Sequence, residues 1–174
     1  TRLDIGANYY HQAYSGPNWY VSESGSNETG DGSTDLPFAT IQKAIDLASG
    51  NNTVWVGDGT YHGTTEVKNS VKILSQNGPE NTILTSSSNA MVFFIDHASP
   101  TISGFTITGN TKGIYMDGNG SGSNPAPIIE NMRFINCNSS IGSLIGGYEA
   151  GNPKIRNSLF ANNTTTSGII AGFS

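Results

Sequence analysis

The stretch Pro100-Thr-Ile-Ser-Gly-Phe-Thr-Ile-Thr-Gly-Asn110 decides the fold, because its chemistry returns twice further along the chain. It returns in Pro127-Ile-Ile-Glu-Asn-Met-Arg-Phe-Ile-Asn-Cys137 and again in Pro153-Lys-Ile-Arg-Asn-Ser-Leu-Phe-Ala-Asn-Asn163. The three units start about 27 residues apart. A fixed period between about 20 and 50 residues is typical of proteins built from stacked repeats.

Each unit has the pattern of a short strand followed by a bend. Ile and Phe alternate with polar residues, which is the period of a strand with one buried face. Gly or Asn stands inside the strand run, and both residues adopt the left-handed backbone conformation readily, so the chain can turn there. Asn side chains that share a column also predict a hydrogen-bonded amide ladder. The shared columns are Ile102, Ile129 and Ile155; Gly104, Asn131 and Asn157; Ile107, Phe134 and Phe160; and Asn110, Cys137 and Asn163.

A second short apolar strand follows each unit, at Gly113–Met116, Ser143–Ile145 and Gly168–Ala171. Two or three strands per turn, separated by bends, predict an all-β parallel β-helix, with an antiparallel β-sandwich as the alternative. Earlier strands are expected at Trp19–Ser22, Thr53–Val56 and Met91–Ile95, with less regular rungs at Val67, Val71–Leu74 and Thr82–Leu84 and a turn at Gly57–Thr60. We expect a lead-in at 1–18, a first strand and capping helix at 19–52, and the rungs at 53–174.

One helix is predicted over Phe38–Ser49. Asp35 or Thr34 would cap it, Pro37 suits its first turn, and Gly50 would end it. Its apolar stripe consists of Phe38, Ile41, Ile45 and Ala48. A helix at the start of a stacked β array is expected to cover the open end of the core.

The composition narrows the class of function. Charged residues make up 12%, the net charge is −5, and Gly occurs 22 times. An acidic chain is poorly suited to neutralise phosphates, which argues against nucleic acid as a partner. The sequence has no apolar run long enough to span a bilayer. Cys137 is the single cysteine, and we expect it to be a packed structural thiol rather than a nucleophile.

The first third of the chain resembles the amino-terminal cap and first coil of right-handed parallel β-helix proteins of bacterial surface and secreted type, and also of pectate-lyase-like proteins. The resemblance is carried by Trp19-Tyr-Val-Ser, Gly25-Ser-Asn, Gly30-Asp-Gly, Pro37-Phe-Ala-Thr-Ile-Gln-Lys-Ala-Ile45 and Val54-Trp-Val-Gly-Asp-Gly-Thr-Tyr61. It implies the fold and a secreted or surface location, but no particular activity.

The repeats are also similar to the motifs of polymorphic outer membrane proteins, in Phe160-Ala-Asn-Asn163 and Gly146-Gly-Tyr148. Leu3-Asp-Ile-Gly-Ala-Asn-Tyr-Tyr10 is similar to the last strand of such domains. This resemblance implies that residues 1–10 end a preceding domain. Because the chain starts at Thr1 and stops just after a strand, we expect a piece of a longer protein, truncated at its carboxyl end.

The catalytic candidates are few. The β-helix lyases that this chain resembles use acidic residues that hold calcium together with a basic residue, and β-helix glycosidases use close carboxylates. We find no recurring outward acidic column, and we expect Glu130 and Arg156 to form an exposed cross-rung salt bridge. Asp96 and His97 form the best titratable pair, although neighbours on a strand are expected to face opposite sides. Asp117 is a third weak candidate.

Two groups are candidates for binding. Glu28, Asp31 and Asp35 lie in an oxygen-rich loop that suits calcium, with a solvated turn as the alternative. The flat, amphipathic aromatic side chains suit contact with sugar rings, although they also suit anchoring of the chain terminus. These aromatic residues are Tyr9, Tyr10, Tyr14 and Trp19.

The sequence favours a noncatalytic β-helix module of a secreted or cell-surface protein. It would serve as a rigid scaffold, an adhesin segment or a carbohydrate-contacting surface, with host or cell-surface glycans and further domains of the same polypeptide as partners. The alternative is a fragment of a polysaccharide lyase or glycosidase whose catalytic rungs are missing or unrecognised. A third hypothesis is self-association through the last rung, near Ile169 and Ile170.

Overall fold

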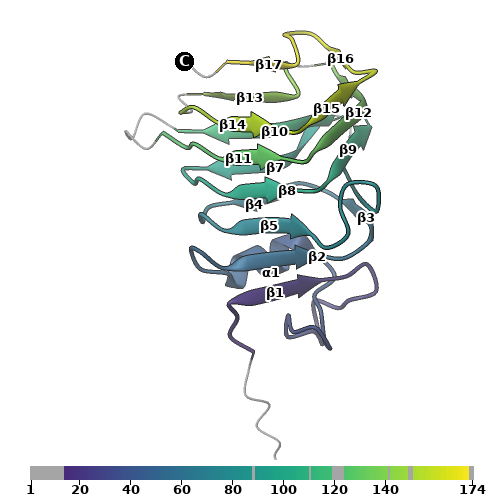
Figure 1. Cartoon of the computed structure of the whole chain (residues 1–174), viewed down its shortest axis with the longest axis vertical. Coiled ribbons are helices and arrows are strands. Elements are labelled where there is room, and N and C mark those ends of the chain that lie inside the picture. Colours follow the sequence, from purple (N-terminus) through teal and green to yellow (C-terminus); the bar gives the residue numbers. More distant parts are fainter. Residues whose placement is uncertain are drawn as a thin grey trace, which may run out of the picture.

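A computed structural model describes residues 14–87, 89–109, 111–118, 124–140, 142–148 and 151–172. Their strands form three parallel sheets that wind around one core, and each turn of the chain adds one rung (Figure 1). Sheet A contains β1 (Asn18–Val21), β2 (Thr53–Val56), β5 (Lys72–Ser75), β8 (Thr101–Ser103), β11 (Ile128–Glu130) and β14 (Lys154–Arg156). Sheet B contains β3 (Gly59–His62), β6 (Thr82–Thr85), β9 (Thr106–Gly109), β12 (Arg133–Ser139) and β15 (Leu159–Ala161). Sheet C contains β4 (Thr65–Val67), β7 (Ala90–Asp96), β10 (Thr111–Asp117), β13 (Ile145–Tyr148) and β17 (Ile170–Ala171), while β16 (Thr164–Thr165) pairs with β12.

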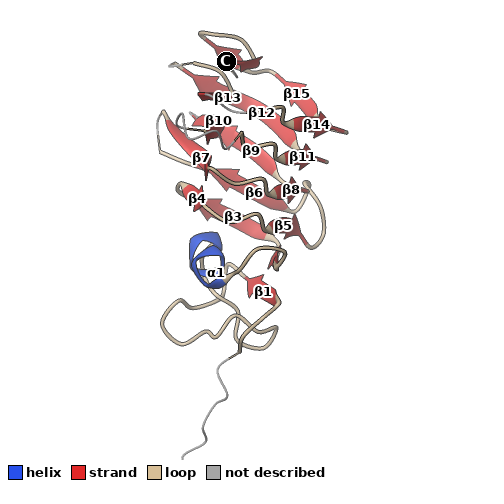
Figure 2. Cartoon of the chain, turned by 90° about the vertical axis from the view of Figure 1, so that its left-hand side faces the viewer, coloured by secondary structure: helices blue, strands red, loops and turns tan. Residues whose placement is uncertain are grey.

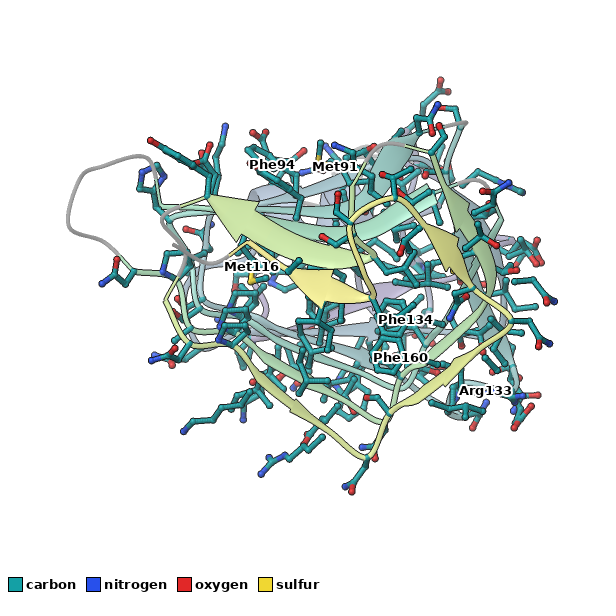
Figure 3. The ribbon with its side chains drawn as sticks, turned by 90° about the horizontal axis from the view of Figure 1, so that it is seen from above. Met91, Phe94, Met116, Arg133, Phe134 and Phe160 are labelled. Atoms are coloured by element: carbon teal, nitrogen blue, oxygen red, sulfur yellow. The ribbon has the colours of Figure 1, made fainter. Side chains whose placement is uncertain are left out.

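The inward columns confirm the predicted parallel β-helix and its register. Ile129 pairs with Ile102 on one side and with Ile155 on the other. Phe134 lies between Ile107 and Phe160 in the same way, and its ring stacks on that of Phe160 with 4.8 Å between centroids. Seen from above, the labelled Phe134, Phe160 and Met116 point into the core (Figure 3). The hydrophobic core therefore runs along the axis as stacked columns.

The bends between sheets A and B confirm the predicted left-handed column. Gly104, Asn131 and Asn157 have φ angles of 87°, 53° and 49°. The amide ladder was predicted wrongly, because the Asn131 amide donates to Ser103 Oγ at 3.1 Å rather than to Asn157. Asn163 does bind the rung below, where its amide donates to the Phe134 carbonyl and accepts from the Cys137 N–H, both at 2.8 Å.

The helix α1 (Ile41–Leu47) lies across the amino-terminal end of the stack, as expected (Figure 2). It starts later than predicted, because Phe38 is in extended backbone and its N–H donates to the Tyr20 carbonyl at 2.9 Å. Thr40 is the N-cap, in place of Thr34 or Asp35, and accepts from the Lys43 N–H. The predicted apolar stripe is buried nevertheless: Phe38, Ile41, Ile45 and Ala48 are all at most 4% exposed.

The turns from sheet A to sheet B differ in length. The predicted turn at Gly57–Thr60 is shorter than expected, since β3 already begins at Gly59. Four of these turns contain two residues each, as at 57–58 and 131–132. The turn at 76–81, between β5 and β6, contains six and projects from the corner (Figure 1).

The last described rung is less buried than the one before it. Ile145 of β13 is fully buried, whereas Ile170 of β17 is 44% exposed. Leu159 of β15 is 50% exposed. Self-association through this rung stays a prediction.

Candidate functional site

The outer surface of sheet C carries aromatic and acidic side chains that point outward from neighbouring strands; we call it the C face. On β7, Phe93 and Ile95 are fully buried, so the strand alternation turns Phe94 and Asp96 outward. The parallel register places Tyr115 beside Phe94. Viewed from above, Met91 and Phe94 point away from the core (Figure 3).

The aromatic part of the C face is a stacked pair. The rings of Phe94 and Tyr115 lie 6.2 Å apart between centroids, with 21° between their planes. The Lys112 ammonium sits 5.7 Å from the centroid of the Tyr115 ring. Burial raises the pKa of Tyr115, and the Asp117 carboxylate raises it further, so the phenol stays protonated near neutral pH. The Tyr115 hydroxyl is therefore a hydrogen-bond donor.

The acidic part of the C face is a column of two aspartates. Asp96 pairs in register with Asp117, and Asp117 pairs with Tyr148 on the next strand. The structure thus brings the weak catalytic candidates Asp96 and Asp117 together. Our expectation that no outward acidic column recurs is wrong for these two rungs.

His97 also differs from its prediction. Its φ of 54° turns the chain out of the strand, so its ring does not face the side opposite to Asp96. His97 Nδ1 instead forms a hydrogen bond with Asp96 Oδ1. The His97 N–H donates to the Asp117 carbonyl at 3.0 Å. His97 therefore holds the Asp96 carboxylate in place and links the two rungs.

The predicted sugar-binding aromatics lie elsewhere. Trp19 is 4% exposed; its ring stacks on Phe38 at 6.2 Å between centroids, and its Nε1 donates to Asn52 Oδ1 at 3.0 Å. It is a core residue, and its prediction as a sugar contact is wrong. Tyr14 packs edge-on against Trp19 and donates its hydroxyl to the Asn18 carbonyl, which anchors this end of the described chain. Tyr9 and Tyr10 lie outside the described residues.

The acidic loop before α1 is tightly folded. Asp31 accepts from the Ser33 N–H at 2.9 Å, while Glu28 and Asp35 are exposed. Asn27 from the same loop accepts from the Ala39 and Thr40 N–H groups, which fixes the start of the helix. Within the described ranges, no three His, Cys, Asp or Glu side chains gather as a metal site. Glu28, Asp31 and Asp35 are therefore not assembled around a common point.

Cys137 is packed, as predicted. It is 1% exposed, its thiol donates to the Ile107 carbonyl at 3.2 Å, and burial raises its pKa to about 12. A thiol that stays protonated at neutral pH is a poor nucleophile.

This raised pKa predicts alkaline destabilisation. Between pH 9.0 and about 12 the folded thiol keeps its proton while the unfolded one loses it. The folded state then binds more protons, so the free energy of unfolding falls as pH rises through this window. Urea titrations across the window should give a shallower fall for Cys137→Ala than for the parent chain. Equal slopes would contradict the assignment.

The C-face aromatics Phe94, Tyr115 and Tyr148 were not predicted as site residues. The signal was present in the alternation of β7 and β10, in which a buried residue stands on each side of Phe94 and of Tyr115.

Among the described residues, none of the helices has the length and apolar composition that a membrane span requires.

Comparison with known proteins agrees with the fold. Residues 24–74 match a protein family described as a protein of unknown function (DUF1565). Over 56 residues the chain is 41% identical to the uncharacterized protein YwoF of Bacillus subtilis (strain 168), a match that covers 32% of this chain and 12% of that protein. A rhamnogalacturonan lyase structure superposes with a TM-score of 0.57 at 15% identity, covering 89% of this chain and 51% of the lyase. The chain is thus a parallel β-helix whose fold is similar to that of a rhamnogalacturonan lyase.

Proposed function

We propose that this chain is a noncatalytic β-helix module of a secreted or cell-surface protein, and that its C face contacts polysaccharide. The observation that carries the proposal is the stacked Phe94–Tyr115 pair beside the Asp96–Asp117 column. Aromatic faces suit the apolar C–H faces of sugar rings. Carboxylates accept strong hydrogen bonds from hydroxyl groups, and the Tyr115 hydroxyl can donate one.

The fold supports this role. The C face belongs to a sheet whose strands are held in register by the core, so its side chains need little rearrangement when a ligand binds. The hollow beside Phe94 has a volume of about 330 Å³ and is lined by Thr64, Glu66, Ala90, Met91 and Phe94. This hollow extends the apolar surface that a sugar chain would cover.

Truncating the half-buried Tyr115 ring tests the proposal. Tyr115→Ala is expected to weaken polysaccharide binding about threefold to tenfold, because it removes one stacking surface and one hydroxyl. The parent chain would be screened on a glycan and pectin array, with and without calcium, and hits measured by calorimetry. Ile135→Ala is the matched control, since Ile135 is a half-buried side chain that faces outward from sheet B. An unchanged affinity in Tyr115→Ala would overturn the C face as the contact surface.

The aspartate column also favours a second candidate function, retaining glycoside hydrolysis. Paired strands lie about 4.8 Å apart, which is close to the spacing of about 5–5.5 Å between the two carboxyl groups of retaining glycosidases. Asp96, oriented by His97, and Asp117 would share the acid and nucleophile roles.

The same samples test this second function. Reducing ends would be followed for hydrolysis, and the ultraviolet absorbance of unsaturated uronides for lyase chemistry. Product that disappears in both Asp96→Asn and Asp117→Asn would establish an enzyme and replace the noncatalytic proposal. Binding without product would support the module. The two variants should keep the aromatic stacking surface, so lost product is distinguishable from lost binding.

A further inference from the structure

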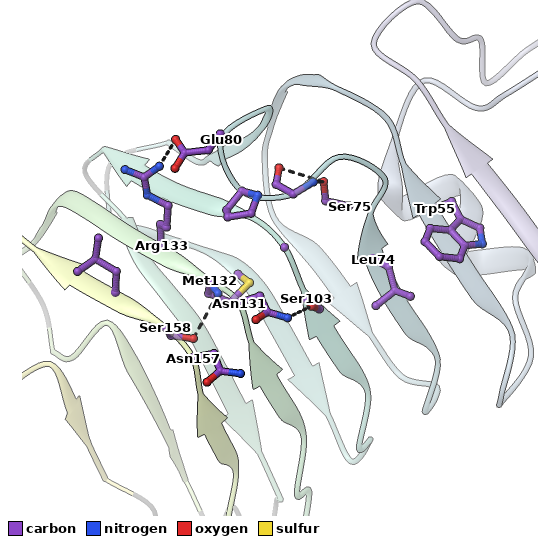
Figure 4. A pocket seen from close by; sticks show the side chains of 14 residues that line it. Trp55, Leu74, Ser75, Glu80, Ser103, Asn131, Met132, Arg133, Asn157 and Ser158 are labelled. Carbon is purple, nitrogen blue, oxygen red and sulfur yellow. Dashed lines mark hydrogen bonds and ion pairs between the residues drawn. The ribbon is translucent and has the colours of Figure 1, made fainter.

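A second concave surface lies on the opposite side of the molecule from the C face, at the corner between sheets A and B. It is a groove of about 1010 Å³ that extends along several rungs (Figure 4). We call it the corner groove. Its lining includes Trp55, Leu74, Ser103, Asn131, Asn157 and Ser158.

The long turn 76–81 borders the groove and is fixed to later rungs. The Thr106 hydroxyl donates to the Pro79 carbonyl at 2.6 Å. Glu80 forms an ion pair with Arg133 on β12. The Gly78 N–H donates to Ser75 Oγ at 3.0 Å. The turn 76–81 is thus held in place by these contacts and forms one border of the groove.

The floor of the groove is apolar at its amino-terminal end. Trp55 and Leu74 pair in register on neighbouring strands of sheet A, and both point outward because Val54 and Ile73 fill the core. Trp55 Nε1 donates to Asn18 Oδ1 at 3.3 Å, which holds the indole in place. An oriented indole on an outer face offers a flat stacking surface.

The rest of the groove combines neutral polar side chains with one ion pair and a few apolar side chains. Ser103, Asn131 and Asn157 bring hydroxyl and amide groups from successive rungs to the corner. The two charged residues in the lining, Glu80 and Arg133, pair with each other. Outside the lining, Arg156 Nε lies 2.6 Å from Glu130 Oε2. The latter pair is the predicted cross-rung salt bridge. The groove therefore presents an indole, neutral hydrogen-bonding groups and one ion pair whose two charges compensate each other.

We infer that the corner groove binds an uncharged polysaccharide chain lying along the solenoid axis. Sugar rings would stack on Trp55, and their hydroxyl groups would exchange hydrogen bonds with the serine and asparagine side chains. An extended peptide fits less well, because β5, β8 and β11 are hydrogen-bonded on both sides and offer no free strand edge. A polyanion fits less well because both guanidinium groups are already paired. This site is independent of the C face.

The two tryptophans make the groove directly observable. Trp19 is buried at 4% exposure, whereas Trp55 is half-exposed in the groove, so added acrylamide should quench mainly Trp55. Soluble neutral glucan, galactan, mannan and xylan would be titrated, with polygalacturonate as the charged comparison. At least one neutral polymer is expected to protect Trp55 from quenching. Trp55→Phe should abolish the protectable signal while leaving the Trp19 emission.

Variants in the left-handed column test the contact between the polysaccharide and the asparagine side chains. Asn131→Gly and Asn157→Gly remove an amide yet keep a residue that suits positive φ, as Gly104 does in the same column. Each is expected to weaken binding about threefold to tenfold. Ile135→Ala, on the outer face of sheet B, is the control and should bind as the parent does.

Two results would overturn the inference. One is the absence of protection by every neutral polymer while the chain remains folded. The other is protection by polygalacturonate or an extended peptide alone. Because Trp55 reports on the corner groove and calorimetry of Tyr115→Ala reports on the C face, failure of either proposal is visible separately.

Discussion

The Ile129→Asp variant is expected not to fold. Ile129 is fully buried between Ile102 and Ile155, and no cationic side chain belongs to this inward column of sheet A. An unpaired carboxylate there loses its hydration without compensation, which costs several kcal/mol or more. The total stability of a domain is about 5–15 kcal/mol. One charge in the central column is therefore enough to remove most of it.

Circular dichroism and urea unfolding would measure this effect. The matched control is Ile128→Asp, one residue earlier on the same strand, where the side chain is half-exposed and faces outward. It should unfold close to the parent. If Ile129→Asp melts like Ile128→Asp, the inward and outward assignment of β11 is wrong.

The Phe38→Ala variant is expected to lose about 3–5 kcal/mol, the usual cost of removing a buried phenylalanine ring. Phe38 is 1% exposed, stacks on Trp19, and lies against Gly32, where a Cβ would come within 2.5 Å of the Phe38 ring. The ring thus fills the space between the acidic loop, β1 and the first rung. Its removal leaves a cavity at the capped end of the core.

Urea unfolding gives the size of this loss, and the near-ultraviolet signal of Trp19 shows whether the cap is displaced first. Leu36→Ala is the control in the same loop, since Leu36 is 43% exposed. A loss for Phe38→Ala no larger than for Leu36→Ala would show that the cap contributes little to stability.

The repeat made the later rungs predictable. Ile102, Ile129 and Ile155 recur at the spacing of the repeat, which predicts both the strands and their pairing. In the structure these three residues pair in register on neighbouring strands. The left-handed column at the bends from sheet A to sheet B was predictable for the same reason, because Gly104, Asn131 and Asn157 recur there. Alternation then fixes which side chains face outward.

The C face was harder to predict, because its register depends on connections rather than on the period. Asp96 and Asp117 lie in one column although they are only 21 residues apart in the sequence. The connection from β6 to β7 spans residues 86–89, whereas that from β9 to β10 is residue 110 alone. The sequence distance between Asp96 and Asp117 is therefore shorter than the repeat of about 27 residues.

The predictions for Trp19 and for the helix N-cap were wrong for a different reason. A tryptophan such as Trp19 can serve either as a core residue or as a contact for a sugar ring. The sequence does not show that Phe38 stacks on Trp19 and places it in the core. Likewise, Thr40 rather than Asp35 caps the helix because Asn27, distant in sequence, binds the Thr40 N–H.

The regular register of sheet A bears on how such a chain changes length. Copying one repeat of about 27 residues in tandem would add a rung that fits its neighbours in sheets A and B, since the inward columns there pair apolar residues from rung to rung. The corner groove would grow by one bend residue with each copy. Unequal recombination within the gene would then lengthen the corner groove in whole steps, one rung at a time.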